Sequence, residues 1–169
     1  MFMHSTGYTL INSFLINGKG MLNNPQLRNF TVPLAKFTVK ANTRYRFRLI
    51  DVGVNYCAKR FSIENHNLTL IAMDGDPIEP VEVESFVPQS GERYDFVLQT
   101  RDEPLNSFIF LSSLNNACLV RNMFQVAELV YEDASNKLNI SEVNYARSVR
   151  LGKVRIIQFI FKSVLDLKC

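Results

Sequence analysis

Hydrophobic and polar residues alternate in short segments along most of this chain. The clearest segment is YRFRLIDV at residues 45–52, where Tyr45, Phe47 and Leu49 alternate with arginines. A period of two places alternate side chains on opposite faces and predicts a strand with one buried face. Similar β-branched and aromatic character predicts strands at FLING (14–18), KFTVKA (36–41), RFSI (60–63), LTLIAM (68–73), VEVESFV (81–87), YDFVLQT (94–100), SFIFLSS (107–113) and FQVAELVY (124–131).

Glycine, proline, asparagine and aspartate punctuate these segments. They cluster in GKG at 18–20, NNP at 23–25, MDGDP at 73–77 and QSGE at 89–92. Asp74-Gly75 predicts a tight turn, because glycine accepts a positive φ without a Cβ clash. Short strands at this spacing, with no helical pattern between them, predict an all-β antiparallel sandwich or barrel over residues 10–132.

The character of the chain changes after Glu132. Residues 133–150 are polar and predict a linker. In the tail, residues 151–169, polar side chains recur at 155, 158, 162 and 166, which is helical spacing. A packed terminal helix or strand-like tail, a helix on a membrane surface and a non-native extension are the three interpretations of the tail.

Composition indicates a single soluble domain. The chain has 169 residues, of which 47% are hydrophobic and 21% charged, and its net charge of +3 comes from interspersed charges of both signs. Arg44, Arg46 and Arg48 would share one solvated face, so we expect no nucleic-acid partner. The start of the chain lacks the pattern of a signal peptide. The longest apolar run, residues 156–161, is too short to span a bilayer.

Four motifs, read together, carry a family resemblance. They are INSFLINGKG at 11–20, YRFRLI at 45–50, HNLTLIAMDGDP at 66–77 and GERYDF at 91–96. In this order they resemble the second cupredoxin-like (plastocyanin-like) domain of multicopper oxidases, with the insect-type laccase the nearest in character. The resemblance implies a Greek-key β-sandwich, the middle one of three. It implies a secreted parent enzyme that oxidises phenols and diphenols and reduces dioxygen to water.

The resemblance places copper in the flanking domains, because the family's histidine-rich ligand motifs are missing from this sequence. The residue count points the same way: a blue-copper site needs two histidines and a cysteine, and the chain has only His4 and His66. The two could share a copper only if His4 folded back beside His66. We expect His66 to be structural, with its ring nitrogens bonded to backbone groups. We predict no catalytic residue, metal ligand or bound cofactor.

Asn12 occupies the position where laccases commonly carry an acidic residue that lines the phenol pocket. An amide can hydrogen-bond a phenol but cannot act as a general base. The alternative is an exposed turn asparagine without a ligand. We expect Tyr94 to pack and bond its hydroxyl at a strand corner, and Asp95 to pair with an arginine. Glu79, Glu82 and Glu84 predict a solvated strand face, with a calcium site as the alternative.

Three cysteines leave at least one thiol without a partner in the chain. The resemblance implies a Cys57–Cys118 disulfide in an exported protein, which would stabilise the fold by about 3–5 kcal/mol, with Cys169 free. In a reducing compartment Cys57 and Cys118 would be buried thiols. Asn-X-Ser/Thr patterns, which mildly favour export, begin at Asn29, Asn67 and Asn139.

The sequence therefore leaves three interpretations. The first is the noncatalytic middle domain of a laccase-like oxidase, present as a fragment, which spaces the flanking copper-bearing domains and forms part of the substrate cleft. The second is a free-standing interaction module, for example a homodimer formed through exposed apolar faces. The third is a small copper enzyme in its own right.

Overall fold

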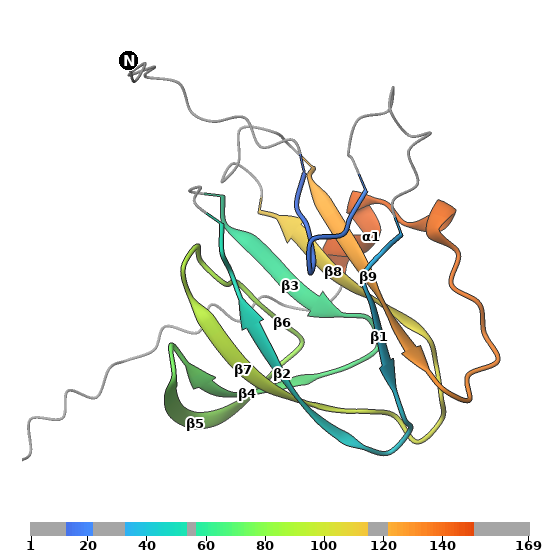
Figure 1. The fold of residues 1–169 in the computed structure, drawn as a ribbon, viewed down its shortest axis with the longest axis horizontal. Helices are drawn as coiled ribbons and strands as arrows, with labels where there is room; N and C mark the ends of the chain where they lie inside the picture. The colour runs from blue at the N-terminus through green and yellow to red at the C-terminus, as the bar shows by residue number, and fades with distance from the viewer. Residues whose placement is uncertain (1–12, 22–32, 54–56, 115–121, 151–169) are drawn as a thin grey trace, which may run out of the picture.

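Two β-sheets face each other in the structure, a computed structural model that describes residues 13–21, 33–53, 57–114 and 122–150 (Figure 1). One sheet has five strands, in the order β1 (Lys36–Val39), β9 (Phe124–Tyr131), β8 (Ser107–Ser113), β3 (Lys59–Ile63) and β6 (Ser85–Phe86). The other has four, in the order β2 (Arg44–Ile50), β7 (Arg93–Gln99), β4 (Leu68–Met73) and β5 (Asp76–Val83). The all-β sandwich predicted from the sequence is confirmed.

The pairing is antiparallel with one exception. β1 runs parallel to β9, with Lys36 opposite Glu128 and Val39 opposite Tyr131. The chain then turns at Asn42, whose φ is 48°, and enters β2 in the other sheet. β1 and β2 therefore lie at the edges of different sheets on the same side of the sandwich (Figure 1).

The predicted strand at residues 14–18 is wrong. Ile16 and Lys19 form a single bridge around a tight turn, in which Asn17 and Gly18 have φ values of 51° and 72°. Asn-Gly is the preferred pair for such a two-residue turn, so the motif ends the extended segment. Buried Gln125 of β9 anchors this hairpin, because its Nε2 donates to the carbonyl oxygen of Phe14 over 2.8 Å.

The other strand predictions are confirmed, with shifted ends. VEVESFV is divided between β5 and β6, and β5 begins earlier than predicted, at Asp76. Its prolines Pro77 and Pro80 fit because β5 is an edge strand, where a missing N–H costs no ladder bond. The predicted turn at Asp74-Gly75 is also confirmed, with φ values of 52° and 101°.

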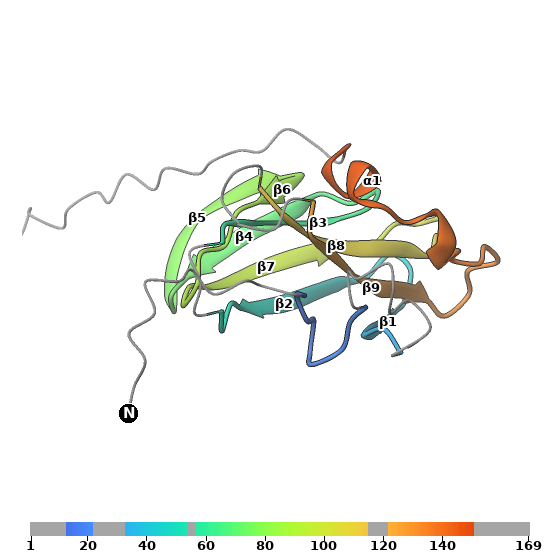
Figure 2. The same cartoon turned by 90° about the horizontal axis from the view of Figure 1, so that it is seen from above.

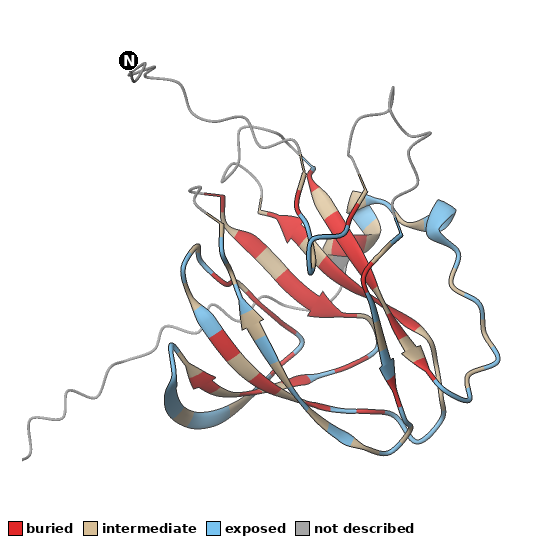
Figure 3. Cartoon of the chain, in the orientation of Figure 1, coloured by how far each residue is buried: buried red, intermediate tan, exposed pale blue. Residues whose placement is uncertain are grey.

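Aromatic rings join the two sheets. Phe96 of β7 stacks on Phe47 of β2 with ring centroids 5.3 Å apart. It also meets Phe61 of β3 at 5.5 Å and Phe86 of β6 at 6.0 Å, so it contacts both sheets. Buried positions alternate with more exposed ones along β2, β4 and β7 of the four-stranded sheet, as a sheet with one solvated face requires (Figure 3).

Residues 133–150, predicted as a polar linker, lie against the outer face of the five-stranded sheet (Figure 2). They contain the 3-10 helix η2 (Ile140–Glu142) and the short helix α1 (Tyr145–Arg150). The Tyr145 hydroxyl donates to the Ser113 carbonyl over 2.7 Å, and Ser148 is fully buried. The tail of residues 151–169 lies outside the described residues.

The aromatic contacts predict where a substitution costs most. Phe96→Ala should lower the free energy of unfolding by about 3–5 kcal/mol, because it removes a ring that contacts both sheets and leaves a cavity. Val97→Ala, the next residue on β7 and half-buried on the opposite face, is the matched control and should cost under about 1.5 kcal/mol. Urea unfolding followed by circular dichroism measures both, and equal losses would contradict the central role of Phe96.

Candidate functional site

His66 is buried and both of its ring nitrogens have partners. It follows β3 in the turn that leads to β4, and only 8% of the residue is exposed. Nδ1 lies 2.7 Å from the carbonyl oxygen of Glu64, and Nε2 lies 2.6 Å from the hydroxyl oxygen of Tyr131. The Tyr131 hydroxyl also accepts a hydrogen bond from the backbone N–H of Arg101 over 2.9 Å.

These contacts are complete when the imidazole of His66 is neutral. A carbonyl oxygen only accepts, so Nδ1 carries the proton. The Tyr131 hydroxyl can then donate to Nε2 while it accepts from Arg101. Burial lowers the pKa of His66, against an opposing effect of the Glu64 carbonyl, and nearby Arg101 lowers it further. Burial likewise raises the pKa of Tyr131. Both rings stay uncharged at neutral pH.

Neither nitrogen of His66 is free to bind a metal without breaking a buried hydrogen bond. Cys57 is disulfide-bonded and therefore offers no thiolate. Within the described ranges, no group of three or more histidine, cysteine, aspartate or glutamate side chains is arranged to hold a metal ion. The donors of this part of the chain do not fit a copper site, and the calcium alternative at Glu79, Glu82 and Glu84 gains no support.

Several predicted positions lie outside the described residues. They are His4, Asn12, Asn29, Cys118 and Cys169. The partner of Cys57 is thus not identified, and the Cys57–Cys118 pairing stays a prediction, as does the role of Asn12. Asn67 and Asn139 are described and exposed. Asn139 already caps η2 by accepting from the N–H of Ser141 over 3.1 Å.

Tyr94 and Asp95 take the places expected of them. Tyr94 of β7 is buried against Phe86. Its hydroxyl donates over 2.9 Å to Oε2 of Glu92, the residue just before β7. Burial, with help from the Glu92 carboxylate, raises the pKa of Tyr94 well above its usual value. Asp95 Oδ2 accepts from Arg46 Nε over 2.9 Å.

The arginines of β2 form the solvated row that the alternation predicted. Arg44, Arg46 and Arg48 are all exposed on the outer side of the four-stranded sheet. Arg44 Nε donates to Gln99 Oε1 over 3.1 Å, and Asp95 pairs with Arg46. The row is therefore partly neutralised by its neighbour β7, which is typical of a soluble strand face.

A cleft of about 840 Å³ opens between the edges of β1 and β2, with the hairpin of residues 13–17 as its third wall. Its lining includes the rings of Phe37, Phe47 and Phe96. One end holds an ion pair, with Lys59 Nζ lying 2.7 Å from Asp51 Oδ2. The two side chains are only 7% and 10% exposed.

Sequence reasoning missed this ion pair. Asp51 fell near the end of the predicted strand 45–52, and Lys59 lay just before the predicted strand 60–63. Their separation of eight residues fits no helix or hairpin spacing, so only the structure reveals the pair. A Cβ at Gly53 would come within 2.9 Å of Asp51 Oδ1, but this close approach is visible only in the structure.

Comparison with known proteins identifies the family. The sequence model described as multicopper oxidase matches residues 3–134. The chain belongs to the multicopper oxidase family. A laccase of Thanatephorus cucumeris, named laccase-2, is 34% identical over 137 residues, and a laccase-2 of Pleurotus ostreatus is 36% identical over 119 residues. The matched parts cover 77% and 63% of this chain but only 21% of each laccase.

Solved structures of multicopper oxidases have a fold similar to that of this chain. The crystal structure of a laccase from Botrytis aclada superposes with a TM-score of 0.58 at 26% identity and covers 80% of this chain and 26% of its own. Fet3p, a multicopper oxidase that functions in iron import, gives a TM-score of 0.55 at 21% identity over 62% of this chain and 21% of its own, a likeness of fold alone. The laccases named here come from fungi, and the insect-type character stays a prediction.

No helix in the described part of this multicopper oxidase chain has the length and apolar character needed to cross a bilayer. The short α1 lies against β8, where its residues contact the sheet.

The lowered pKa of His66 predicts a pH-dependent stability. Below about pH 6.5 the unfolded chain binds a proton at this histidine, whereas the folded chain resists it. Stability from this group is therefore present above pH 6.5 and is lost as the pH falls toward the lower pKa of the folded state, by up to about 1.4 kcal/mol per pH unit. Urea unfolding at pH 7.5, 6.5 and 5.5 measures the loss.

The matched variant is His66→Gln. It should cost about 1–3 kcal/mol at pH 7.5, because buried partners lose hydrogen bonds, but its stability should change less between pH 6.5 and 5.5. The other histidine, His4, is present in both proteins and cancels. The same pH slope in both proteins would show that His66 does not titrate as its buried neutral form requires.

Proposed function

We propose that this chain is the noncatalytic middle domain of a laccase-like multicopper oxidase that oxidises phenols and diphenols and reduces dioxygen to water. The observation that carries the proposal is the use of both nitrogens of His66 in buried hydrogen bonds. The chain's only other histidine is His4. A blue-copper site needs two free imidazoles and a thiolate, so copper in the parent enzyme would be held by other domains.

The relative lengths support a role as one part of a larger enzyme. The chain spans about a fifth of the laccases it matches, 21% in each of the two described above. In such an enzyme this sandwich would separate and orient the two copper-bearing domains and form one wall of the substrate cleft. Asn12 would lie in that wall and hydrogen-bond the phenol without accepting its proton.

An exposed apolar patch supports contact with a neighbouring domain. Leu15, Ile50 and Val52 are 58%, 62% and 84% exposed and all border the cleft between β1 and β2. Large exposed hydrophobic side chains that cluster at one end of a domain favour an interface. The disulfide at Cys57 fits an oxidising compartment and hence a secreted parent.

Copper titration tests the middle-domain proposal directly. Purified chain mixed with Cu²⁺ should show no intense visible absorption of a copper–thiolate bond, and it should consume no dioxygen when a catechol is added. Joining the chain to the flanking segments of its own transcript should restore both, if those segments carry His-X-His motifs. A blue colour in the chain alone would overturn the proposal.

A free-standing interaction module is the second candidate, and the apolar patch is the observation that favours it. The two candidates differ in the encoded surroundings: flanking His-X-His motifs on both sides would fit the middle domain, and their absence would fit the module. They also differ in the state of Leu15, Ile50 and Val52 in the isolated chain. A middle domain would leave these side chains exposed, whereas a module would cover them with a second copy of the chain.

Sedimentation of the purified chain separates the two candidates. The middle-domain proposal predicts a monomer at micromolar concentration, since the partner of the patch is a different domain. A stable dimer that Ile50→Ser/Val52→Ser converts to monomer would favour the module. Ile140→Ser is the matched control, because Ile140 is an exposed hydrophobic residue (41%) on η2, outside the patch.

A further inference from the structure

Four strands form the sheet edges in the described part of the chain, and three of them are poorly suited to pair with a further strand. β6 has only two residues and β1 only four. β5 carries Pro77 and Pro80, which lack an N–H, and its register with β4 contains an irregularity. Short length, prolines and irregular pairing are common ways in which proteins protect a sheet edge. The fourth edge strand, β2, has seven residues in continuous register and none of these features.

The backbone of β2 presents a regular row of hydrogen-bonding groups to its open side. Just before β2, the carbonyl oxygen of Thr43 accepts from the N–H of Thr100, and just after it the N–H of Asp51 donates to the carbonyl oxygen of Glu92, each over 3.0 Å. Since alternate residues of an antiparallel strand bond to a given neighbour, the odd-numbered residues of β2 bond to β7. The N–H and C=O groups of its three arginines therefore point to the open edge, where no other described strand lies.

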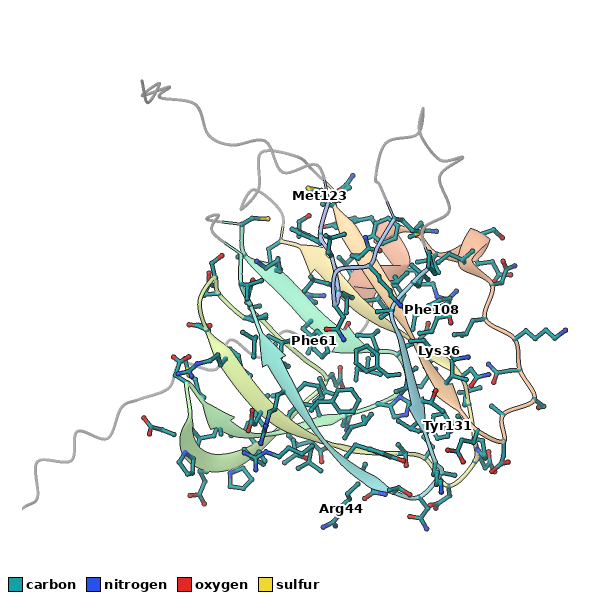
Figure 4. The ribbon with its side chains drawn as sticks, in the orientation of Figure 1. Lys36, Arg44, Phe61, Phe108, Met123 and Tyr131 are labelled. Atoms are coloured by element: carbon teal, nitrogen blue, oxygen red, sulfur yellow. The ribbon has the colours of Figure 1, made fainter. Side chains whose placement is uncertain are left out.

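The side chains of β2 form a charged outer row and an apolar inner row. Its three arginines are exposed, and the labelled Arg44 projects away from the sandwich (Figure 4). Among the described carboxylates, only that of Asp95 pairs with this row. The residues between the arginines are half-buried and line the cleft beside β1; they are Tyr45, Phe47 and Leu49. A strand added to this edge would meet positive charge on one face and apolar walls on the other.

We propose that the open edge of β2 binds an extended segment of a partner protein in which acidic and apolar residues alternate. The segment would add antiparallel to β2, because antiparallel pairing is slightly more stable per residue. Its backbone would bond to the free N–H and C=O groups, its acidic side chains would lie beside the arginines, and its apolar side chains would enter the cleft. This site needs no copper and stands whether or not the chain is a middle domain.

A second copy of β2 fits this edge poorly. Two copies that pair about a two-fold axis would place arginines of one strand directly opposite arginines of the other, because the outward-bonding residues are the same in both. Like charges at directly opposite positions destabilise a strand pair. The row of arginines thus favours a different, acidic partner, and the chain alone should remain a monomer.

A labelled peptide tests whether the partner bonds to the backbone. Fluorescein-Gly-Gly-Glu-Val-Glu-Val-Glu-Val-Glu should bind the wild-type chain in a fluorescence anisotropy titration at about 0.15 M salt, where charges farther apart than about 8 Å are largely screened. In the antiparallel arrangement the glutamates carry the N–H groups that bond to β2. N-methylation of the two central glutamates should weaken binding about tenfold or more, whereas N-methylation of two valines should change it less than about threefold.

A charge-reversed variant tests the arginines. Arg48 is exposed, so Arg48→Glu should keep the fold, as circular dichroism would verify. The variant should bind the glutamate peptide about three- to tenfold more weakly, because an opposite-charge pair becomes a like-charge pair, and a Lys-Val peptide of the same pattern more tightly. Lys137→Glu changes the net charge equally at an exposed position outside β2 and should bind both peptides as the wild type does.

Several outcomes would overturn this proposal. Equal losses from the two kinds of N-methylation would show that charge alone attracts the peptide, without strand addition. Equal weakening by Arg48→Glu and Lys137→Glu would place the peptide elsewhere. No binding to the wild-type chain would exclude the site. Loss of peptide binding after the chain is joined to the flanking segments of its own transcript would show that a neighbouring domain, and not a partner protein, occupies the edge.

Discussion

The contact between the rings of Phe96 and the phenylalanines around it is the interaction on which this sandwich depends. In the described part of the chain, two facing sheets bury a large share of their apolar side chains between them, and here Phe96 touches rings from both. The same cluster sets the limits of the core. Between the edge strands β1 and β2, Phe47 has Phe96 on one side and Phe37 at 5.7 Å on the other, and all three rings line the cleft. The cleft is the consequence, because its walls are the last rings of the core.

In the turn that follows β3, hydrogen bonds rather than aromatic rings hold the chain in place. His66 has its two nitrogens satisfied by a carbonyl oxygen and a tyrosine hydroxyl, and that tyrosine, Tyr131, closes the set with a backbone donor. A fully satisfied buried polar group rigidifies its surroundings, whereas a metal in its place would leave Tyr131 without an acceptor. The geometry therefore leaves neither ring nitrogen of His66 available to a metal without the loss of a buried hydrogen bond.

Much of the fold could be predicted from the sequence, because alternation with a period of two is a local signal and each strand carries it. The failures are equally physical. The segment at 14–18 has strand-forming residues, but Asn17-Gly18 turns the chain before a ladder can form. Helix α1 is too short for a helical period to appear in the sequence. The site was harder: both ring nitrogens of His66 were expected to bond backbone groups, but only Nδ1 does so. The partner of Nε2 is the hydroxyl of Tyr131, 65 residues away, and no local pattern reports such a contact. The Asp51–Lys59 pair likewise follows no local pattern in the sequence.

Glu64 links the histidine to the segment that follows the last strand. Its carbonyl oxygen accepts from His66, while its carboxylate receives Arg147 of α1 through Nε at 3.0 Å and Nη2 at 2.8 Å. Arg147 also lies 5.5 Å from the centre of the Phe108 ring, and the N–H of Glu64 donates to the Phe108 carbonyl over 2.9 Å. The turn that holds His66 is thus fastened to β8 and to α1 at once. Because the Glu64 side chain is only 14% exposed, loss of Arg147 would leave a poorly solvated charge beside the turn. The polar composition of residues 133–150 therefore reflects side chains that bond to the sandwich. The turn that holds His66 is tied to a residue 83 positions after Glu64 in the chain.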